Sequence, residues 1–282
     1  MNGIVTSQRR HPSCCKTSHG IAGPSGGAKH LHLSMTSERY ALVLLPGLHG
    51  NDLLFRPLLS HLPSHIRRIT VSYPPARELG YEDLLPKVLS ALPADMPFVL
   101  LGESFSGPLA VMAAATRPPG LRGLVLVATF VRNPVWSRPG WLRHLAHRYT
   151  FRCLMPIARV IAPLRGCKTP ELRALSAAAR ADLTPAVMSH RVRSVLRADV
   201  REELAACPVP VLYLHGDRDG VVGRRNLADV MRIRPTTEVV GIAGAPHMVL
   251  QTRPAESAEA IARFMATVIG EVSSATTGRG SS

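Results

Sequence analysis

The residues L-L-G-E-S-F-S-G at positions 100–107 decide the fold, because they join two different kinds of segment through a very short turn. The run F-V-L-L at 98–101 is apolar, and P-L-A-V-M-A-A-A at 108–115 suits a helix. A serine inside so tight a strand-to-helix turn has a strained backbone, and its hydroxyl points out of the end of the sheet. Ser104 is therefore a candidate nucleophile.

The turn leaves two alternatives open. The usual spacing is G-x-S-x-G, and here Gly102 takes the place of the first glycine while Ser106 takes that of the second. Ser106 could itself be the exposed serine, but Pro108 would then stand two residues after it, where a fixed φ and added bulk fit poorly. A buried strand followed by a helix that Ser104 or Ser106 caps would also produce these residues.

Outward from this turn, apolar runs alternate with helix-forming runs, which indicates βαβ units and a parallel sheet. Right-handed crossovers place helices on both faces of such a sheet, and sites form at the carboxyl ends of its strands. The predicted fold class is therefore α/β, with a mostly parallel central sheet. The predicted strands cover 40–45, 66–72, 98–101, 121–127, 209–214 and 237–242, and the predicted helices cover 53–59, 81–92, 108–116, 224–231 and 255–269.

Three local expectations accompany these elements. Asn51 or Asp52 should cap the helix at 53–59. Pro86 should lie in the first turn of the helix at 81–92, where proline is tolerated. The last helix should turn four side chains inward: Ile261, Phe264, Met265 and Val268.

Residues 131–204 interrupt the alternation. They contain short helix-like pieces separated by prolines, both tryptophans and no evident strand. Because a crossover between strands needs far fewer residues, we interpret this segment as a helical lid inserted over the site. An ordinary set of connecting helices is the alternative. The α/β core then comprises residues 38–130 and 205–271.

The two ends of the chain differ from the rest in composition. Residues 1–37 are rich in Gly, Ser and His, contain the flexible stretch G-P-S-G-G at 23–27, and show no apolar periodicity. Such a segment cannot bury enough apolar surface to order itself, so we expect a disordered extension and take Met35 as the natural start. The segment also lacks the apolar stretch of a secretory signal. The Ser-, Thr- and Gly-rich residues 272–282 are expected to form a disordered tail.

Charge and cysteine content narrow the classes of function. The net charge of +15 suggests nucleic acid, but the basic residues are nearly all arginine, without a lysine-rich tail, so we expect no nucleic-acid partner. The five cysteines show no C-x-x-C spacing, which argues against a disulfide framework and a zinc site and suits a reducing, cytoplasmic compartment. The sequence has no apolar run of about eighteen residues, so no transmembrane helix is expected.

Three polar signals lie at the carboxyl ends of three predicted strands: Ser104, an aspartate in the turn at 216–220, and His247. An aspartate in a turn, or a lone histidine after a glycine, has an ordinary structural explanation. The conjunction of all three, in the order Ser, Asp, His, matches one of the known orders of a catalytic triad.

With these residues, the chain resembles the α/β-hydrolase superfamily over residues 39–270. The resemblance implies Ser104 as nucleophile, His247 as general base, and Asp219 rather than Asp217 as the acid that orients the histidine. The matching segments are L-P-G-L-H-G at 45–50, G-E-S-F-S-G at 102–107, H-G-D-R-D-G-V-V at 215–222 and G-A-P-H at 244–247.

The resemblance also implies an oxyanion hole made of two backbone N–H groups. One belongs to the residue after the nucleophile, Phe105, and the other to the loop after the first strand, where Leu48 is the expected donor. The family often has H-G-x in this loop, whereas this chain has Pro-Gly-Leu at 46–48. Because His49 follows directly, the register of the loop stays open.

The implied activity is hydrolysis of a carboxylic ester or thioester through an acyl-enzyme, with no metal or organic cofactor. A serine nucleophile argues against epoxide hydrolase and dehalogenase chemistry, in which relatives use aspartate. Two alternatives remain. One is a non-catalytic binding protein of the same fold, and the other is a lactone or C–C bond hydrolase that uses the same triad.

The lid segment carries most of the excess charge. Residues 131–201 hold fourteen basic and three acidic residues, a net charge of +11. A basic lid would steer an acidic partner to the site. Relatives with a small helical lid include the pimeloyl-carrier-protein methyl ester esterases, whose carrier protein is acidic, so by analogy an acyl-carrier-linked or anionic acyl ester is a candidate substrate. An arginine-rich lid that is simply solvated is the alternative.

Overall fold

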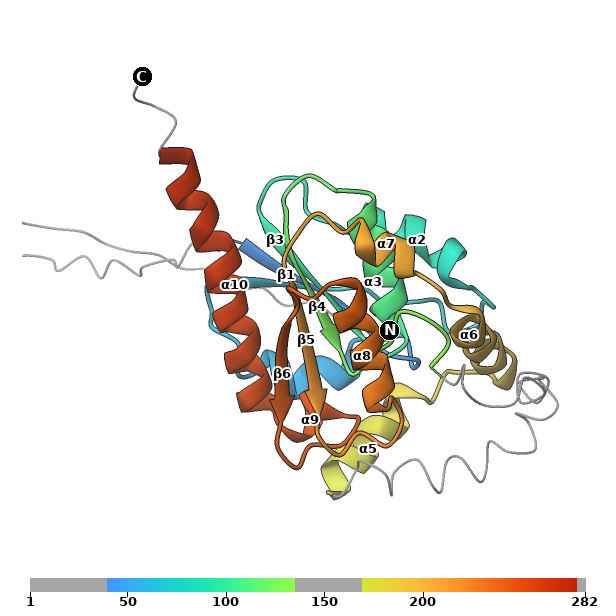
Figure 1. Ribbon diagram of the computed structural model, residues 1–282. Coiled ribbons are helices and arrows are strands. Elements are labelled where there is room, and N and C mark those ends of the chain that lie inside the picture. The colour runs from blue at the N-terminus through green and yellow to red at the C-terminus, as the bar shows by residue number, and fades with distance from the viewer. Residues whose placement is uncertain (1–39, 135–168, 278–282) are drawn as a thin grey trace, which may run out of the picture. The chain divides into compact units, whose positions relative to one another are not determined.

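The computed structural model describes residues 40–134 and 169–277, with side chains as far as residue 270. Within these residues, six parallel strands form one sheet in the order β2-β1-β3-β4-β5-β6 (Figure 1). This confirms the predicted α/β sheet. Successive strands are added on one side of β1 up to β2 and on its other side from β3 onward, so the strand order reverses between β1 and β3. In α/β proteins the carboxyl ends of the strands at such a point form the binding crevice. The strands are β1 Tyr40–Leu45, β2 Ile66–Thr70, β3 Phe98–Glu103, β4 Leu121–Val127, β5 Val211–Gly216 and β6 Glu238–Ile242.

Alternate residues of each central strand enter two separate hydrophobic cores. In β1, Ala41, Val43 and Leu45 face one core, whereas Leu42 and Leu44 face the other, and all five are fully buried. A strand that is buried on both faces needs an apolar residue at every position, which explains the continuous apolar runs of the sequence.

Helices cover both faces of the sheet (Figure 1). Side chains of α2, α3, α7 and α8 fill the core on one face, and those of α1, α9 and α10 fill the core on the other. The four side chains of the last helix that were predicted to face inward are all buried. The helices are α1 Arg56–Leu59, α2 Tyr81–Ser90, α3 Ser106–Ala115, α5 Pro170–Ala179, α6 Pro185–Arg197, α7 Arg201–Ala205, α8 Arg224–Ile233, α9 Val249–Thr252 and α10 Pro254–Thr277, with a 3-10 turn, η1, at Leu53–Phe55.

Two predicted helices differ from those observed. The expected helix at 53–59 is η1 followed by a single α-helical turn, and the Asn51 side chain, not that of Asp52, accepts a hydrogen bond from the backbone at its start. The helix α2 begins at Tyr81, as predicted, but Pro86 is its sixth residue and therefore lies in the second turn rather than the first, since a turn has only 3.6 residues.

The last helix is longer than predicted. It runs past Ile269 as far as Thr277, so residues 272–277 are helical where the sequence predicted a disordered tail. The apolar spacing that defined the helix fades before it ends, which is why the sequence placed its end too early. The remaining predictions for the extension at 1–37 and for residues 278–282 lie outside the described residues.

The two ends of the segment inserted after β4 lie side by side. Arg132 and Asp199 form an antiparallel bridge, and the Val200 N–H donates to the Val131 carbonyl at 2.8 Å. The Arg132 guanidinium also pairs with Asp229 of α8 at 2.7 Å. In the sequence, helices α5 and α6 come between the two bridged segments. Residues 135–168 of the insertion lie outside the described residues.

Candidate active site

Ser104 occupies the turn between β3 and α3 with a φ of 50°, which is in the left-handed region. Such a conformation costs a non-glycine residue about 1–3 kcal/mol and persists only where its surroundings hold it. The Ser104 N–H donates to the Val127 carbonyl at 2.8 Å. Its own carbonyl accepts hydrogen bonds from the Gly107 N–H, at 3.2 Å, and from the Thr129 hydroxyl. The strained geometry expected for a nucleophile is therefore present at Ser104.

The turn has no space for larger residues on either side of Ser104. A Cβ atom on Gly102 would lie 2.5 Å from the carbonyl oxygen of Ser106, and one on Gly107 would lie 1.9 Å from Oγ1 of Thr129. Both glycines are thus required by close packing of the backbone against its neighbours.

Ser106 is fully buried, and its hydroxyl is used in packing. The Ser106 hydroxyl donates to the Pro46 carbonyl. Since that hydroxyl has a single proton, the Tyr73 hydroxyl must be the donor in the 2.6 Å bond between the two side chains. Ser106 therefore occupies the position of the second glycine, and its buried hydroxyl forms hydrogen bonds with both Pro46 and Tyr73.

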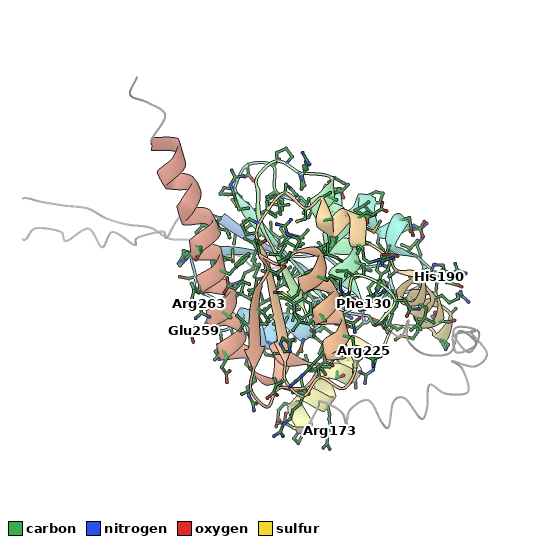
Figure 2. The ribbon with its side chains drawn as sticks, in the orientation of Figure 1. Phe130, Arg173, His190, Arg225, Glu259 and Arg263 are labelled. Carbon is green, nitrogen blue, oxygen red and sulfur yellow. The ribbon has the colours of Figure 1, made fainter. Side chains whose placement is uncertain are left out.

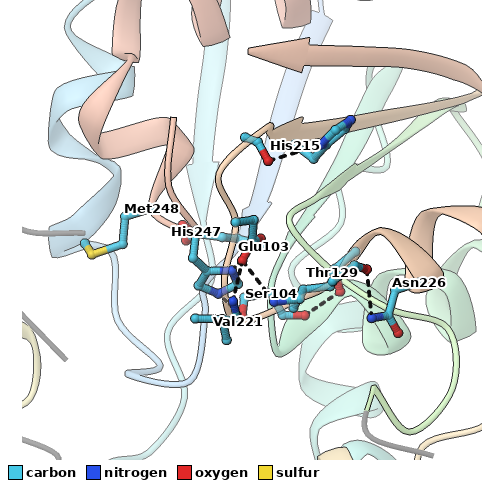
Figure 3. Close-up of polar contacts among 12 residues, drawn as sticks. Glu103, Ser104, Thr129, His215, Val221, Asn226, His247 and Met248 are labelled. Carbon is cyan, nitrogen blue, oxygen red and sulfur yellow. Dashed lines mark hydrogen bonds and ion pairs between the residues drawn. The ribbon is translucent and has the colours of Figure 1, made fainter. Parts of the chain in front are cut away.

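His247 and Asp219 extend a chain of hydrogen bonds from Ser104. Figure 3 shows the side chains of Ser104 and His247 in this site. The Oγ atom of Ser104 is 2.9 Å from Nε2 of His247, and Nδ1 of His247 is 2.8 Å from Oδ2 of Asp219. The aspartate oxygen can only accept, so it fixes the proton on Nδ1 and leaves Nε2 free to accept the serine proton. Asp219, and not the exposed Asp217, is the aspartate that the structure brings to this site.

The loops that carry Asp219 and His247 hold each other in place. The Asp219 side chain is 4% exposed, and its second oxygen accepts the N–H groups of Val221 at 2.8 Å and Val222 at 2.9 Å. A Cβ atom on Gly216 would lie 2.2 Å from the Ala245 carbonyl oxygen, because the loop after β5 passes directly against the loop after β6. The Asp219 carboxylate is thus held in place by contacts that do not involve His247.

Two backbone N–H groups, those of Leu48 and Phe105, have no acceptor among the described residues. The loop after β1 is a turn in which the Gly50 N–H donates to the Gly47 carbonyl at 3.0 Å, and Leu48 is its first central residue. The N–H of that residue takes no part in a β-turn. Among the hydrogen bonds of the described residues, neither the Leu48 N–H nor the Phe105 N–H is a donor. The structure thus leaves free both groups that the sequence nominated for the oxyanion.

Two titratable side chains flank this site, and sequence reasoning gave neither a role. The Glu103 carboxyl is 6% exposed, and burial raises its pKa. Gln251 of α9, which follows the His247 loop, donates to it at 2.8 Å. Burial lowers the pKa of His49 from 6.5 to about 4, so its imidazole is neutral at neutral pH.

Neither a metal cluster nor a membrane helix occurs in the part of the chain that the structure describes. No group of three or more His, Cys, Asp or Glu side chains in residues 40–134 and 169–270 is placed to hold a metal ion. None of the helices in the described ranges combines the length and the apolar character that a membrane crossing needs.

Comparison with known proteins places this geometry in a family. Curated relatives named pimeloyl-[acyl-carrier protein] methyl ester esterase match over their whole length. The protein from Xanthomonas oryzae pv. oryzae is 28% identical over 257 residues, covering 84% of this chain and 100% of the relative. The protein from Xylella fastidiosa is 28% identical over 264 residues, with the same coverage.

Solved structures share the fold. A bromoperoxidase from Bacillus anthracis superimposes with a TM-score of 0.68 at 17% identity, covering 81% of this chain and 92% of the other. Esterase RhEst1 from Rhodococcus superimposes with a TM-score of 0.60 at 22% identity, covering 81% and 91%. The profile of the Alpha/beta hydrolase family matches residues 42–260. This chain therefore belongs to the alpha/beta hydrolase family.

Proposed function

We propose that this chain is a serine hydrolase that cleaves a carboxylic ester or thioester through an acyl-enzyme intermediate. The observation that carries the proposal is the unbroken chain of hydrogen bonds from Ser104 through His247 to Asp219, with links of 2.9 and 2.8 Å. The esterase names of the curated relatives support the coarser statement that the chain hydrolyses ester bonds.

In the proposed mechanism, Ser104 attacks the acyl carbonyl while His247 accepts its proton at Nε2. The histidine then gives this proton to the leaving alcohol or thiol, and the acyl group stays on Ser104 as an ester. Water attacks that ester with His247 again as base, which releases the acid and restores the serine. Asp219 holds the imidazole in the required tautomer and stabilises its cation.

The oxygen of the attacked carbonyl becomes negative in the tetrahedral intermediate. We assign its stabilisation to the N–H groups of Leu48 and Phe105, which have no acceptor among the described residues. Such donors act in the transition state because they are already oriented when the charge develops, and removing one typically costs about 2.7–4 kcal/mol.

The substrate class follows from the relatives and from charge. The relatives' name describes a methyl ester on an acyl carrier protein, and we propose an acyl ester presented by an acidic carrier for this chain as well. Exposed arginines stand near the end of the sheet where the strands terminate. Figure 2 shows two of them, Arg173 on α5 and Arg225 on α8. Basic side chains at this end would steer an acidic partner toward Ser104, and we propose the inserted residues 131–204 as the lid that carries most of them.

Salt dependence tests the carrier proposal. The kcat/KM for a pimeloyl methyl ester on acyl carrier protein should fall steeply between 50 and 500 mM salt, because screening weakens attraction between exposed charges. The kcat/KM for p-nitrophenyl butyrate, which is neutral, should stay nearly constant and serves as the control. Equal salt dependence of the two substrates would refute steering.

Turnover by matched serine variants tests the chemistry. Wild-type protein should hydrolyse p-nitrophenyl butyrate, and Ser104→Ala should lose this activity by about 10⁴-fold or more, since removing one triad member abolishes the nucleophilic route. Ser106→Ala removes a neighbouring hydroxyl of the same type and should retain turnover. Full activity of the Ser104→Ala variant would exclude the proposed nucleophile.

A further inference from the structure

The carbonyl of Leu48 is anchored by a side chain from the lid. Arg191 of α6 donates from Nη1 to this carbonyl at 2.8 Å and from Nη2 to the Pro74 carbonyl at 3.3 Å. Only 1% of its surface is exposed, although arginine is among the residues that proteins bury least often. An arginine held so deeply against one loop requires a reason.

The Arg191 guanidinium is a buried charge without a carboxylate partner among the described residues. Its cation lies over the ring of Tyr73, 5.7 Å from the ring centre, and its remaining contacts are to carbonyl oxygens. Its Nε atom has no acceptor among the described residues. Burying a charge is costly unless it is fully bonded, so apolar packing alone would not favour this residue.

The loop after β1 is shaped around this side chain. Gly50 has a φ of 79°, and a Cβ atom there would lie 2.4 Å from Nη1 of Arg191. Two further contacts join the same loop to the lid. Asn51 donates to the Ala179 carbonyl at the end of α5 at 2.7 Å. The Leu48 side chain packs against a lid cluster that consists of Leu183, Val187 and Met188.

The second proposed oxyanion residue shows the same arrangement. The Tyr81 hydroxyl of α2 donates to the Phe105 carbonyl at 2.9 Å, and the Tyr81 ring stacks on that of Phe105 with centroids 4.9 Å apart. At both residues the N–H has no acceptor in the part of the chain that the structure describes, while a buried side chain holds the carbonyl. A donor that must meet an oxyanion needs this kind of support, since its value lies in being oriented beforehand.

We propose that Arg191 is a positioning residue of the oxyanion hole, through which lid helix α6 holds the Leu48 N–H in its working orientation. The proposal rests on the proposed function, since it presumes that Leu48 stabilises an oxyanion. The lid then has a second role besides covering the site, because one of its side chains completes the frame of the catalytic loop.

Substitution of Arg191 separates positioning from substrate binding. Arg191→Met keeps an unbranched side chain like the arginine stem but removes both hydrogen bonds and the charge. We expect kcat for p-nitrophenyl butyrate to fall about 10- to 100-fold while KM changes less than threefold, because loss of a whole donor costs about 10²–10³-fold. The affinity for a trifluoromethyl ketone, which forms a tetrahedral oxyanion adduct, should fall by the same factor as kcat. Arg191→Lys, which keeps the charge and one donor, should recover part of both.

The matched control is Arg193→Met on the same helix. Arg193 is 32% exposed and faces Glu78 at 3.8 Å, so its loss should leave kcat and the ketone affinity unchanged. Equal behaviour of folded Arg191→Met and Arg193→Met would overturn the proposal. If Arg191→Met does not fold, a ketone affinity of Arg191→Lys at least threefold below that of wild type supports the proposal, and an unchanged affinity refutes it. Wild-type protein that hydrolyses no ester would instead refute the proposed function.

Discussion

The Thr129 hydroxyl donates a hydrogen bond to the carbonyl oxygen of Ser104, the residue with the strained backbone at the centre of the site. Thr129 follows the carboxyl end of β4, and its own carbonyl accepts a hydrogen bond from the Tyr213 hydroxyl at 2.5 Å. The strained backbone of Ser104 is therefore stabilised by a residue that follows β4, and that residue is in turn hydrogen-bonded by Tyr213 of β5.

Thr129→Val should weaken this support, because valine has the same shape but no hydroxyl. The Ser104 carbonyl would lose one of its two donors, and a buried polar group left short of a partner costs about 1–3 kcal/mol. We expect a lower free energy of unfolding in urea, together with a lower kcat. Thr129→Ser keeps the donor and should behave like wild type in kcat. Identical kcat values for the valine and serine variants would show that the hydroxyl does not support the turn.

Ser106 and Tyr73 should be energetically coupled. Ser106→Ala leaves both the Pro46 carbonyl and the Tyr73 hydroxyl without their partner, so we expect a loss of about 1–3 kcal/mol in the free energy of unfolding. Tyr73→Phe removes one bond and leaves the bond from Ser106 to Pro46 intact, so its loss should be smaller. The double variant should lose less free energy of unfolding than the sum of the two single losses, and the difference should be about 0.5–3 kcal/mol. Additive losses would contradict the network.

Gly102→Ala should disrupt the turn through sterics alone. The new Cβ atom would lie 2.5 Å from the Ser106 carbonyl oxygen and 2.7 Å from Cβ of Ala110, and neither can move without shifting α3. Overpacking of this kind costs about 1–3 kcal/mol, and we expect a lower Tm together with lost esterase activity. Gly223→Ala is the matched control, because a Cβ atom there meets nothing within 4 Å. A Gly102→Ala variant as stable and active as the control would contradict the observed packing.

His49 predicts an acid dependence of stability. Burial lowers its pKa in the folded chain from 6.5 to about 4, so the unfolded chain takes up the proton first as the pH falls. The free energy of unfolding should thus be unaffected by this group above pH 6.5 and should fall by about 3 kcal/mol on its account by pH 4. Urea unfolding at several pH values should show that the free energy of unfolding of His49→Asn falls less steeply between pH 6.5 and pH 4 than that of wild type. His61→Asn removes an exposed histidine and should keep the wild-type slope; a wild-type slope for His49→Asn would refute the assignment.

The sequence predicted the sheet and the position of the three polar side chains for one physical reason. Parallel strands that are buried on both faces appear as continuous apolar runs, and their carboxyl ends all reach the same edge. Ser104 and Asp219 follow such runs, and His247 follows the largely exposed edge strand β6. Because all three strands end at the same edge of the sheet, the proximity of these side chains could be predicted without knowledge of any contact. The same rule could have found Thr129, which stands two residues after the end of β4.

The supporting residues could not be predicted in this way. Arg191 lies 143 positions from Leu48 along the chain, and its place depends on how helix α6 packs on the core. In the sequence it is one of fourteen basic residues between positions 131 and 201, which together predicted a basic lid that steers an acidic partner, with a simply solvated lid as the alternative. The burial that distinguishes Arg191 from the others is a tertiary property, as is the raised pKa of Glu103.

The central claim is that Ser104 carries the acyl group, and covalent labelling tests it most directly. A fluorophosphonate forms a stable bond with an activated serine, and mass spectrometry of the digested protein identifies the modified residue. We predict one adduct per chain, on Ser104, that is absent from Ser104→Ala and retained in Ser106→Ala. An adduct on Ser106, or undiminished labelling of the Ser104→Ala variant, would contradict the account.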